Sequence, residues 1–159
     1  MKLIKEYKNL LETKWTEKDP EYYDITNYTW NEDGTLDVNG WVMLQHRRLT
    51  KLPFKFGRVN GNFFIFSNLL TSLEGCPREV TESFNCGFNQ ITSLEGAPRI
   101  VGNNFRCYYN LNLTKLKGFP RKVGGDVHIY NCGVDIDTDY IRARCDIGGE
   151  LITMDLAEN

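Results

Sequence analysis

One eight-residue motif recurs along this chain at a nearly constant spacing, and this repeat constrains the fold more than any other feature. The motif Leu70-Thr-Ser-Leu-Glu-Gly-Cys-Pro77 returns as Ile91-Thr-Ser-Leu-Glu-Gly-Ala-Pro98 and as Leu113-Thr-Lys-Leu-Lys-Gly-Phe-Pro120. A shorter copy begins at Leu49, so the four copies start 21, 21 and 22 residues apart. A fixed period of this length predicts that the chain stacks similar units into a solenoid.

A second column of residues lies between these motifs. Pairs of apolar residues recur there at alternate positions, namely Phe63 and Ile65, Phe84 and Cys86, Phe105 and Cys107, with weaker copies near 42–44, 127–129 and 151–153. This alternation predicts short strands with one buried face. Each copy then reaches a small polar residue: Asn68, Asn89, Asn110 or Cys132. We expect these side chains to form a buried ladder that hydrogen-bonds the backbone where the chain turns.

The residues of one repeat resemble a known family. The pattern Phe84-x-Cys86-x-x-Asn89-x-Ile91-x-x-Leu94 resembles the core of the leucine-rich repeat. The amino-acid sequence of the motif, and that of the segment 33–40 before it, are similar to leucine-rich-repeat-like proteins encoded by tailed phages. The resemblance covers about residues 33–134 and implies a protein-binding scaffold with a parallel β-sheet on its concave face. It implies no catalytic residues. About 13 residues between strands are too few for a full convex helix in each repeat.

The predicted fold is therefore an α+β leucine-rich-repeat solenoid that forms a single domain over 1–159. We expect an N-terminal cap over 1–38, the repeat array over 39–134 and a C-terminal cap over 135–159. The N-terminal cap combines an amphipathic helix over 2–15 with a hairpin over 25–38. Asp19-Pro20 prevents the helix from continuing toward the hairpin. The C-terminal cap combines one or two helical turns over 135–144 with a last strand near 150–154.

If the alternating apolar residues point inward, the residues between and after them point outward and form one sheet face. The predicted partner-binding residues are Met43, Gln45, Phe64, Phe66, Asn85, Phe88, Arg106, Tyr108, Tyr109, His128 and Tyr130. His46 and Gly87 share the same columns. A solvated sheet face would instead carry Thr, Lys and Glu. Contiguous exposed aromatic residues, with Arg among them, are typical of interaction sites.

Three explanations of this face stay open at the sequence level. It can bind another protein, it can close a homodimer, or the caps can cover it. Because the resemblance is to phage proteins, it implies a host enzyme or a host defence protein as the partner, inhibited by occlusion or held on a scaffold. A phage-encoded protein of this kind would act in the host cell cytoplasm.

The charge is segregated along the chain. Residues 1–40 carry a net charge of −4, residues 41–122 carry +8 and residues 123–159 carry −6, which together give −2. The basic middle favours a partner with an acidic surface, or it is balanced by acidic caps that keep the array in solution. Binding of single-stranded nucleic acid is a third hypothesis, since Arg and aromatic residues can stack bases. The acidic ends, and basic residues that lie off the aromatic column, count against it.

Enzyme, cofactor and metal functions are disfavoured. His128 shares a column with Arg106 and Asn85, but no nucleophile motif, paired carboxylates or phosphate loop accompanies them. Gly124-Gly125-Asp126 precedes a strand, which is the wrong context for a nucleotide site. The five cysteines lack CxxC spacing and occupy repeat columns, so we interpret them as structural thiols of a reducing compartment. A charged N-terminal segment, and no apolar run near the ~18 residues of a membrane span, favour a cytoplasmic location and no membrane partner.

Overall fold

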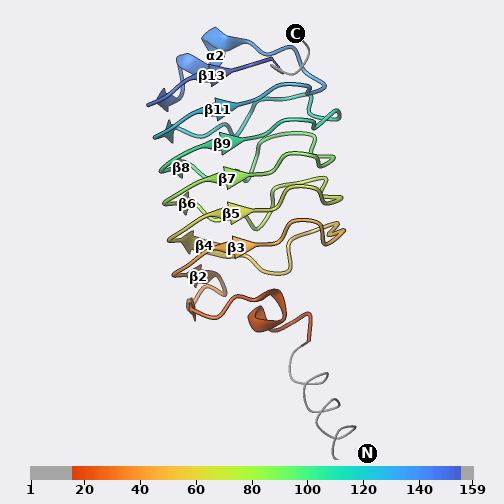
Figure 1. Cartoon of the computed structure of the whole chain (residues 1–159), viewed down its shortest axis with the longest axis vertical. Helices are drawn as coiled ribbons and strands as arrows, with labels where there is room; N and C mark the ends of the chain where they lie inside the picture. The colour runs from red at the N-terminus through yellow and green to blue at the C-terminus, as the bar shows by residue number, and fades with distance from the viewer. Residues whose placement is uncertain (1–15, 155–159) are drawn as a thin grey trace, which may run out of the picture.

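The chain winds as a β-solenoid in which one coil stacks on the next in sequence order, as the continuous colour change along the stack shows (Figure 1). The structure is a computed structural model that describes residues 16–154. The helix predicted over 2–15 lies outside the described residues, as does the end of the predicted C-terminal cap.

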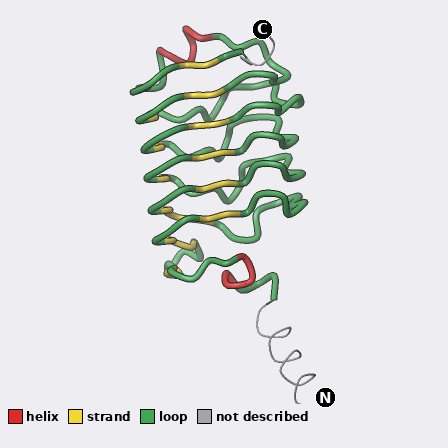
Figure 2. The backbone as a smooth tube through the Cα atoms, in the orientation of Figure 1, coloured by secondary structure: helices red, strands yellow, loops and turns green. Residues whose placement is uncertain are grey.

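Two sheets run along the stack, and most coils contribute a strand to each (Figure 2). The six-stranded sheet has the order β13-β11-β9-β7-β5-β3 and contains the strands that the alternating column predicts. All its neighbours are parallel. Its strands are β3 (Val42–Met43), β5 (Phe63–Phe64), β7 (Phe84–Asn85), β9 (Phe105–Arg106), β11 (Val127–His128) and β13 (Leu151–Ile152).

The seven-stranded sheet has the order β1-β2-β4-β6-β8-β10-β12, and apart from the hairpin at its start the sequence does not predict it. It contains β1 (Tyr28–Trp30), β2 (Leu36–Val38), β4 (Phe56–Val59), β6 (Glu79–Val80), β8 (Ile100–Val101), β10 (Lys122–Val123) and β12 (Asp146–Ile147). Only the β1–β2 pair is antiparallel within the described chain. A valine in each repeat explains this sheet, because Val80 pairs with Val101, Val101 pairs with Val123, and all three are fully buried.

The second sheet changes the fold class. The coils have strands on two sides, and the strands of both sheets follow one another at the same spacing. In a leucine-rich repeat, helices on one side occupy more space than the strands and bend the stack, and the described coils have no such helical side. Within residues 16–154 the one α-helix is α2 (Thr138–Arg142), beside the short 3-10 helix η1 (Pro20–Tyr23). The described chain is therefore a mostly-sheet β-solenoid rather than an α+β protein.

Stacked phenylalanines fill the space between the two sheets. Phe63, Phe84 and Phe105 are fully buried, with ring centroids 5.9 and 5.5 Å apart and ring planes nearly parallel. The rings stack because each occupies the same position in consecutive coils, whose strands pair in register. Burying one such side chain contributes about 2–3 kcal/mol, so this column is the main apolar core of the middle coils.

The predicted polar ladder is confirmed. The amide Nδ2 of Asn89 donates to the carbonyl oxygens of Ile65 at 2.9 Å and Cys86 at 3.2 Å, and its Oδ1 accepts the Leu70 amide at 3.0 Å. Asn68 and Asn110 repeat this pattern. At the equivalent position the Cys132 thiol donates to the Cys107 carbonyl at 3.2 Å. The side chain at this position thus joins its own coil to the preceding one.

The two ends of the array are only partly as predicted. The hairpin over 25–38 is confirmed as β1 and β2, with Tyr28 opposite Val38 and Trp30 opposite Leu36. Asp19-Pro20 begins η1, with proline in its first turn. The last strand is present as β13, and a short helix precedes it. β12 and β13 extend both sheets, so the described part of segment 135–159 continues the stacking of the array.

Candidate functional site

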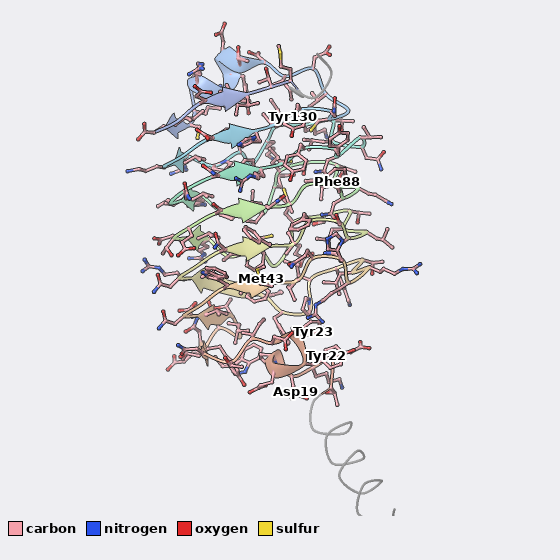
Figure 3. The ribbon with its side chains drawn as sticks, viewed as in Figure 1. Asp19, Tyr22, Tyr23, Met43, Phe88 and Tyr130 are labelled. Atoms are coloured by element: carbon pink, nitrogen blue, oxygen red, sulfur yellow. The ribbon has the colours of Figure 1, made fainter. Side chains whose placement is uncertain are left out.

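Aromatic side chains gather on the outer side of the six-stranded sheet and on the corner that follows it. We call this surface the aromatic face and define it by His46, Phe64, Phe66, Phe88, Tyr108, Tyr109 and Tyr130. Figure 3 shows Phe88 and Tyr130 on the same side of the stack. The structure therefore brings together most of the residues that the sequence predicts as a binding surface.

The C-terminal half of the face is a continuous aromatic cluster. The rings of Phe88 and Tyr109 are stacked with centroids 4.7 Å apart, and those of Tyr108 and Tyr130 are stacked at 5.3 Å. Phe88 also meets Tyr108 edge-to-face at 5.5 Å, and Tyr109 meets Tyr130 at 6.0 Å. These contacts hold the rings in fixed positions, because edge-to-face and stacked pairs each add about 0.5–1.5 kcal/mol. The cluster is thus a preformed surface.

The N-terminal half of the face carries a smaller group centred on Phe66. Its ring lies 5.2 Å from His46, edge-to-face, and 6.2 Å from Phe64. Met43 is half-buried on β3 and pairs with Phe64 on β5, so it lies beside this group (Figure 3). Gln45 is also half-buried, and its Oε1 is a buried acceptor to which no described group donates.

A left-handed backbone at one corner position explains how the face extends beyond the sheet. His46, Ser67, Phe88, Tyr109 and Asn131 recur at this position, and all have φ between 50° and 58°. Strict alternation would turn Phe88 and Tyr109 inward, but the left-handed residue reverses the chain and keeps them at the surface. Phe88 is 47% exposed. Bulky residues rarely adopt this conformation, and nothing in the residue types of Phe88 or Tyr109 predicts it.

The middle of the face is covered by Tyr108. A Cβ atom at Gly87 would lie 2.8 Å from the Tyr108 ring, so only glycine leaves room for this ring. Asn85 donates to the Tyr108 hydroxyl at 3.4 Å and accepts the Gly87 amide at 3.0 Å. Its side chain is 7% exposed. Asn85 was expected to point into solvent, but the structure places it beneath the face, where it supports Tyr108.

The column Asn85, Arg106 and His128 is brought together on adjacent strands, as the register shows. Burial, and then the positive charge of Arg106, lower the pKa of His128 below its usual value near 6.5. His128 is therefore neutral at pH 7. A half-buried guanidinium and a neutral imidazole on this face present hydrogen-bonding groups beside the aromatic rings.

The cysteines are buried thiols without disulfide bonds, except that Cys132 is half-buried. Burial raises the pKa of Cys76, and burial together with Asp146 raises the pKa of Cys145 to about 11. These two thiols are protonated at neutral pH and are poor nucleophiles. The described residues contain no cluster of three His, Cys, Asp or Glu placed to hold a metal ion. No helix within residues 16–154 has the length and apolar character that crossing a membrane requires.

The sequence analysis missed a row of arginines beside the seven-stranded sheet. Arg78, Arg99 and Arg121 stack on consecutive coils and are exposed. The signal is present in the sequence as a Pro-Arg pair in three repeats, at Pro77, Pro98 and Pro120. The pair alone does not indicate a surface, because equivalent residues align along the stack only where the segment forms paired strands, and no alternation predicts strands there.

Comparison with protein-family models, with curated proteins and with solved structures finds no match to this chain. Any function assigned to it rests on the residues and geometry described above.

Proposed function

We propose that this protein binds another protein through the aromatic face and acts by occlusion or as a scaffold. The observation that carries this proposal is the packed cluster of Phe88, Tyr108, Tyr109 and Tyr130 on one surface, with Phe88 half-exposed on a left-handed backbone. Aromatic anchors that are already fixed lose little conformational entropy on binding, so more of their burial contributes to affinity.

Two further features support a binding role. A sheet face that only meets water is usually polar, whereas this one carries an aromatic ring on most coils. The backbone at Phe88 and Tyr109 also adopts a conformation that costs non-glycine residues about 1–2 kcal/mol. The same conformation recurs at Ser67 and Asn131, so it belongs to the repeat, and at Phe88 and Tyr109 it places an aromatic ring at the surface.

The class of partner is proposed from the repeat. Its resemblance to leucine-rich-repeat-like proteins of tailed phages supports a host enzyme or host defence protein as the partner, with inhibition as the outcome. We also propose that the protein is related to these phage proteins, that it acts in the cytoplasm and that caps close the ends of the array. A guanidinium at Arg106 and the neutral His128 would supply polar contacts that set the orientation of the partner.

The test is affinity capture from host lysate with the double variant Phe66→Ala, Tyr108→Ala. We expect the wild-type protein to retain a specific host protein and the double variant to lose it. Tyr22→Ala is the matched control, because Tyr22 is also aromatic and 46% exposed but lies on the first described coil, away from the face (Figure 3). Far-UV circular dichroism establishes that all three proteins are folded. Equal capture by the double variant would contradict the proposal.

Self-association through the same face is the competing outcome. Sedimentation at micromolar concentration separates the two, because a face that closes a homodimer gives a dimer that the double variant converts to a monomer. A wild-type monomer removes this alternative.

A further inference from the structure

The arginine ladder, which consists of Arg78, Arg99 and Arg121, is a second surface distinct from the aromatic face. Each residue directly precedes a strand of the seven-stranded sheet. The Arg99 amide donates to the Arg78 carbonyl at 2.9 Å, and the Arg121 amide donates to the Arg99 carbonyl at 2.9 Å. The three residues are therefore in register, one coil apart, and the neighbouring strands pair in the same register.

The arginines of the ladder have no directly paired acid in the described chain, and the electrostatic interaction of Arg78 with Asp33 is longer than a salt bridge. Opposite charges pair on neighbouring coils at Arg58 with Glu79 (3.1 Å) and, beside the ladder itself, at Lys117 with Glu95 (2.7 Å). None of the three ladder side chains forms a salt bridge or side-chain hydrogen bond with a described residue. Like charges on adjacent strands are destabilising, so this column costs stability that an anionic ligand would recover.

The ladder borders an open groove that crosses three coils. The groove is also lined by Gly96, Ala97 and Gly118, which carry little or no side chain. Gly96 and Gly118 have φ near 92° and 91°, and a Cβ at Gly96 would meet the Leu73 carbonyl at 2.7 Å. Small residues are therefore required by the turn itself, and they leave the arginine side chains accessible along the length of the groove.

The spacing of the ladder indicates which anionic ligand fits. Neighbouring strands lie ~4.8 Å apart, so three arginines span roughly 10 Å along the stack. Carboxylates at positions i, i+4 and i+7 of an α-helix span about 10.5 Å along one face. Carboxylates at i, i+2 and i+4 of an extended strand span about 13 Å, which is longer than the span of the three arginines. The planar guanidinium also matches a carboxylate with two parallel hydrogen bonds.

Single-stranded nucleic acid fits this groove less well. Such ligands require aromatic side chains on which bases stack. The aromatic residue that lines the groove is Phe119, which is half-buried and packs against Phe105 with ring centroids 5.4 Å apart. Glu95 also lines the groove, but Lys117 pairs with it at 2.7 Å, so this residue does not discriminate between a carboxylate and a phosphate ligand.

We propose that the arginine ladder binds an acidic α-helix of a protein partner, with one carboxylate for each arginine. This surface lies on the other sheet and does not depend on the aromatic face. Variants of the ladder and variants of Phe66 and Tyr108 therefore test the two proposals separately.

The experiment uses the full chain and synthetic alanine-based helical peptides labelled for fluorescence anisotropy at low salt. One peptide carries three glutamates on one helix face at i, i+4 and i+7. A second carries the same glutamates distributed around the helix, and an oligothymidine serves as a third probe. We expect the patterned peptide to bind most tightly. Arg99→Ala should weaken it about tenfold or more, as for the loss of a charge-assisted hydrogen-bonded pair. Arg99→Lys keeps the positive charge but loses the planar guanidinium, so it should weaken binding of the patterned peptide less.

The control variant is Arg48→Gly. Arg48 is exposed, lies off the ladder and has φ 57°, a conformation that glycine adopts freely. It removes one positive charge without touching the groove, so binding of the patterned peptide should change less than twofold. Circular dichroism checks that Arg99→Ala is folded. The proposal is overturned by equal losses for Arg48→Gly and Arg99→Ala, by equal affinity for both peptides, by tighter ladder-dependent binding of oligothymidine, or by no binding at low salt.

Discussion

The two sheets of this solenoid are alike on their inner sides and different on their outer sides. Inward, the six-stranded sheet repeats phenylalanine at 63, 84 and 105, and the seven-stranded sheet repeats valine at 59, 80 and 101. Outward, the first sheet carries aromatic rings and the second carries arginines and salt bridges. The type of each inner residue is constrained because it packs against the equivalent residue of the next coil. The type of each outer residue is constrained only by what the surface contacts. The repeated residues therefore indicate the fold, and the outer residues that depart from the repeat indicate function.

The sharpest form of this comparison is a pair of adjacent residues on β5. Phe63 points inward and stacks on Phe84, while its neighbour Phe64 lies half-buried on the aromatic face. We expect Phe63→Ala to lower the free energy of unfolding by about 3–5 kcal/mol, because it removes a buried ring and leaves a cavity. Phe64→Ala should cost about 1 kcal/mol or less. Urea denaturation measures both, and equal losses would remove the distinction between the two sides.

The polar ladder should behave like the inner sides although its residues are polar. Asn89→Ala leaves the buried Leu70 amide without its acceptor, whereas the Ile65 and Cys86 carbonyls still accept from Asn68 and Asn110. We expect a loss of about 1–3 kcal/mol, the cost of leaving one buried polar group unpaired. The exposed neighbour serves as the control, and Gln90→Ala should change stability by less than about 0.5 kcal/mol. A small effect of Asn89→Ala in denaturant melts would mean that water replaces these hydrogen bonds.

Substitutions at the left-handed corner position should affect stability and partner binding differently. Ser67→Gly should raise the free energy of unfolding by roughly 1 kcal/mol, because glycine adopts a positive φ without the steric cost. Phe88→Gly gains the same relief but loses ring contacts with Tyr108 and Tyr109 worth a similar amount, so its stability should change little. Phe88→Gly should nevertheless lose partner capture, whereas Ser67→Gly should retain it. If Phe88→Gly captures the partner normally, the ring at this corner does not take part in binding.

The smallest expected effect is a pH dependence that arises on the outer side of the six-stranded sheet. The pKa of His128 is lower in the folded protein than its ordinary value near 6.5. The unfolded chain therefore binds a proton more readily, and stability is lost as pH falls from about 7 through the lower folded pKa. His128→Gln should flatten this part of the stability profile, measured by urea denaturation between pH 7.5 and 5. An unchanged profile in the variant would show that another group causes the dependence.

The sequence predicts the parts of this molecule that repeat with an alternating pattern. The inward residues from Phe63 to Cys107, and the ladder at Asn68, Asn89 and Asn110, could be located because chemistry and spacing agree there. The seven-stranded sheet could not, since each of its middle strands has a single buried residue, Val80, Val101 or Val123, and one residue shows no alternation. The same is true of the left-handed corner, because Phe88 and Tyr109 are not residue types that favour a positive φ. Burial of Asn85 depends on Tyr108, which belongs to the next coil.

The central claim is that the aromatic face, rather than the surface in general, contacts the partner. The most direct measurement is site-specific photo-crosslinking with p-benzoyl-phenylalanine placed at Phe88 in one protein and at Tyr22 in another, two aromatic positions of similar exposure. We predict a crosslink to one host protein from position 88 and none from position 22. No crosslink from position 88, or the same products from both positions, would contradict the claim.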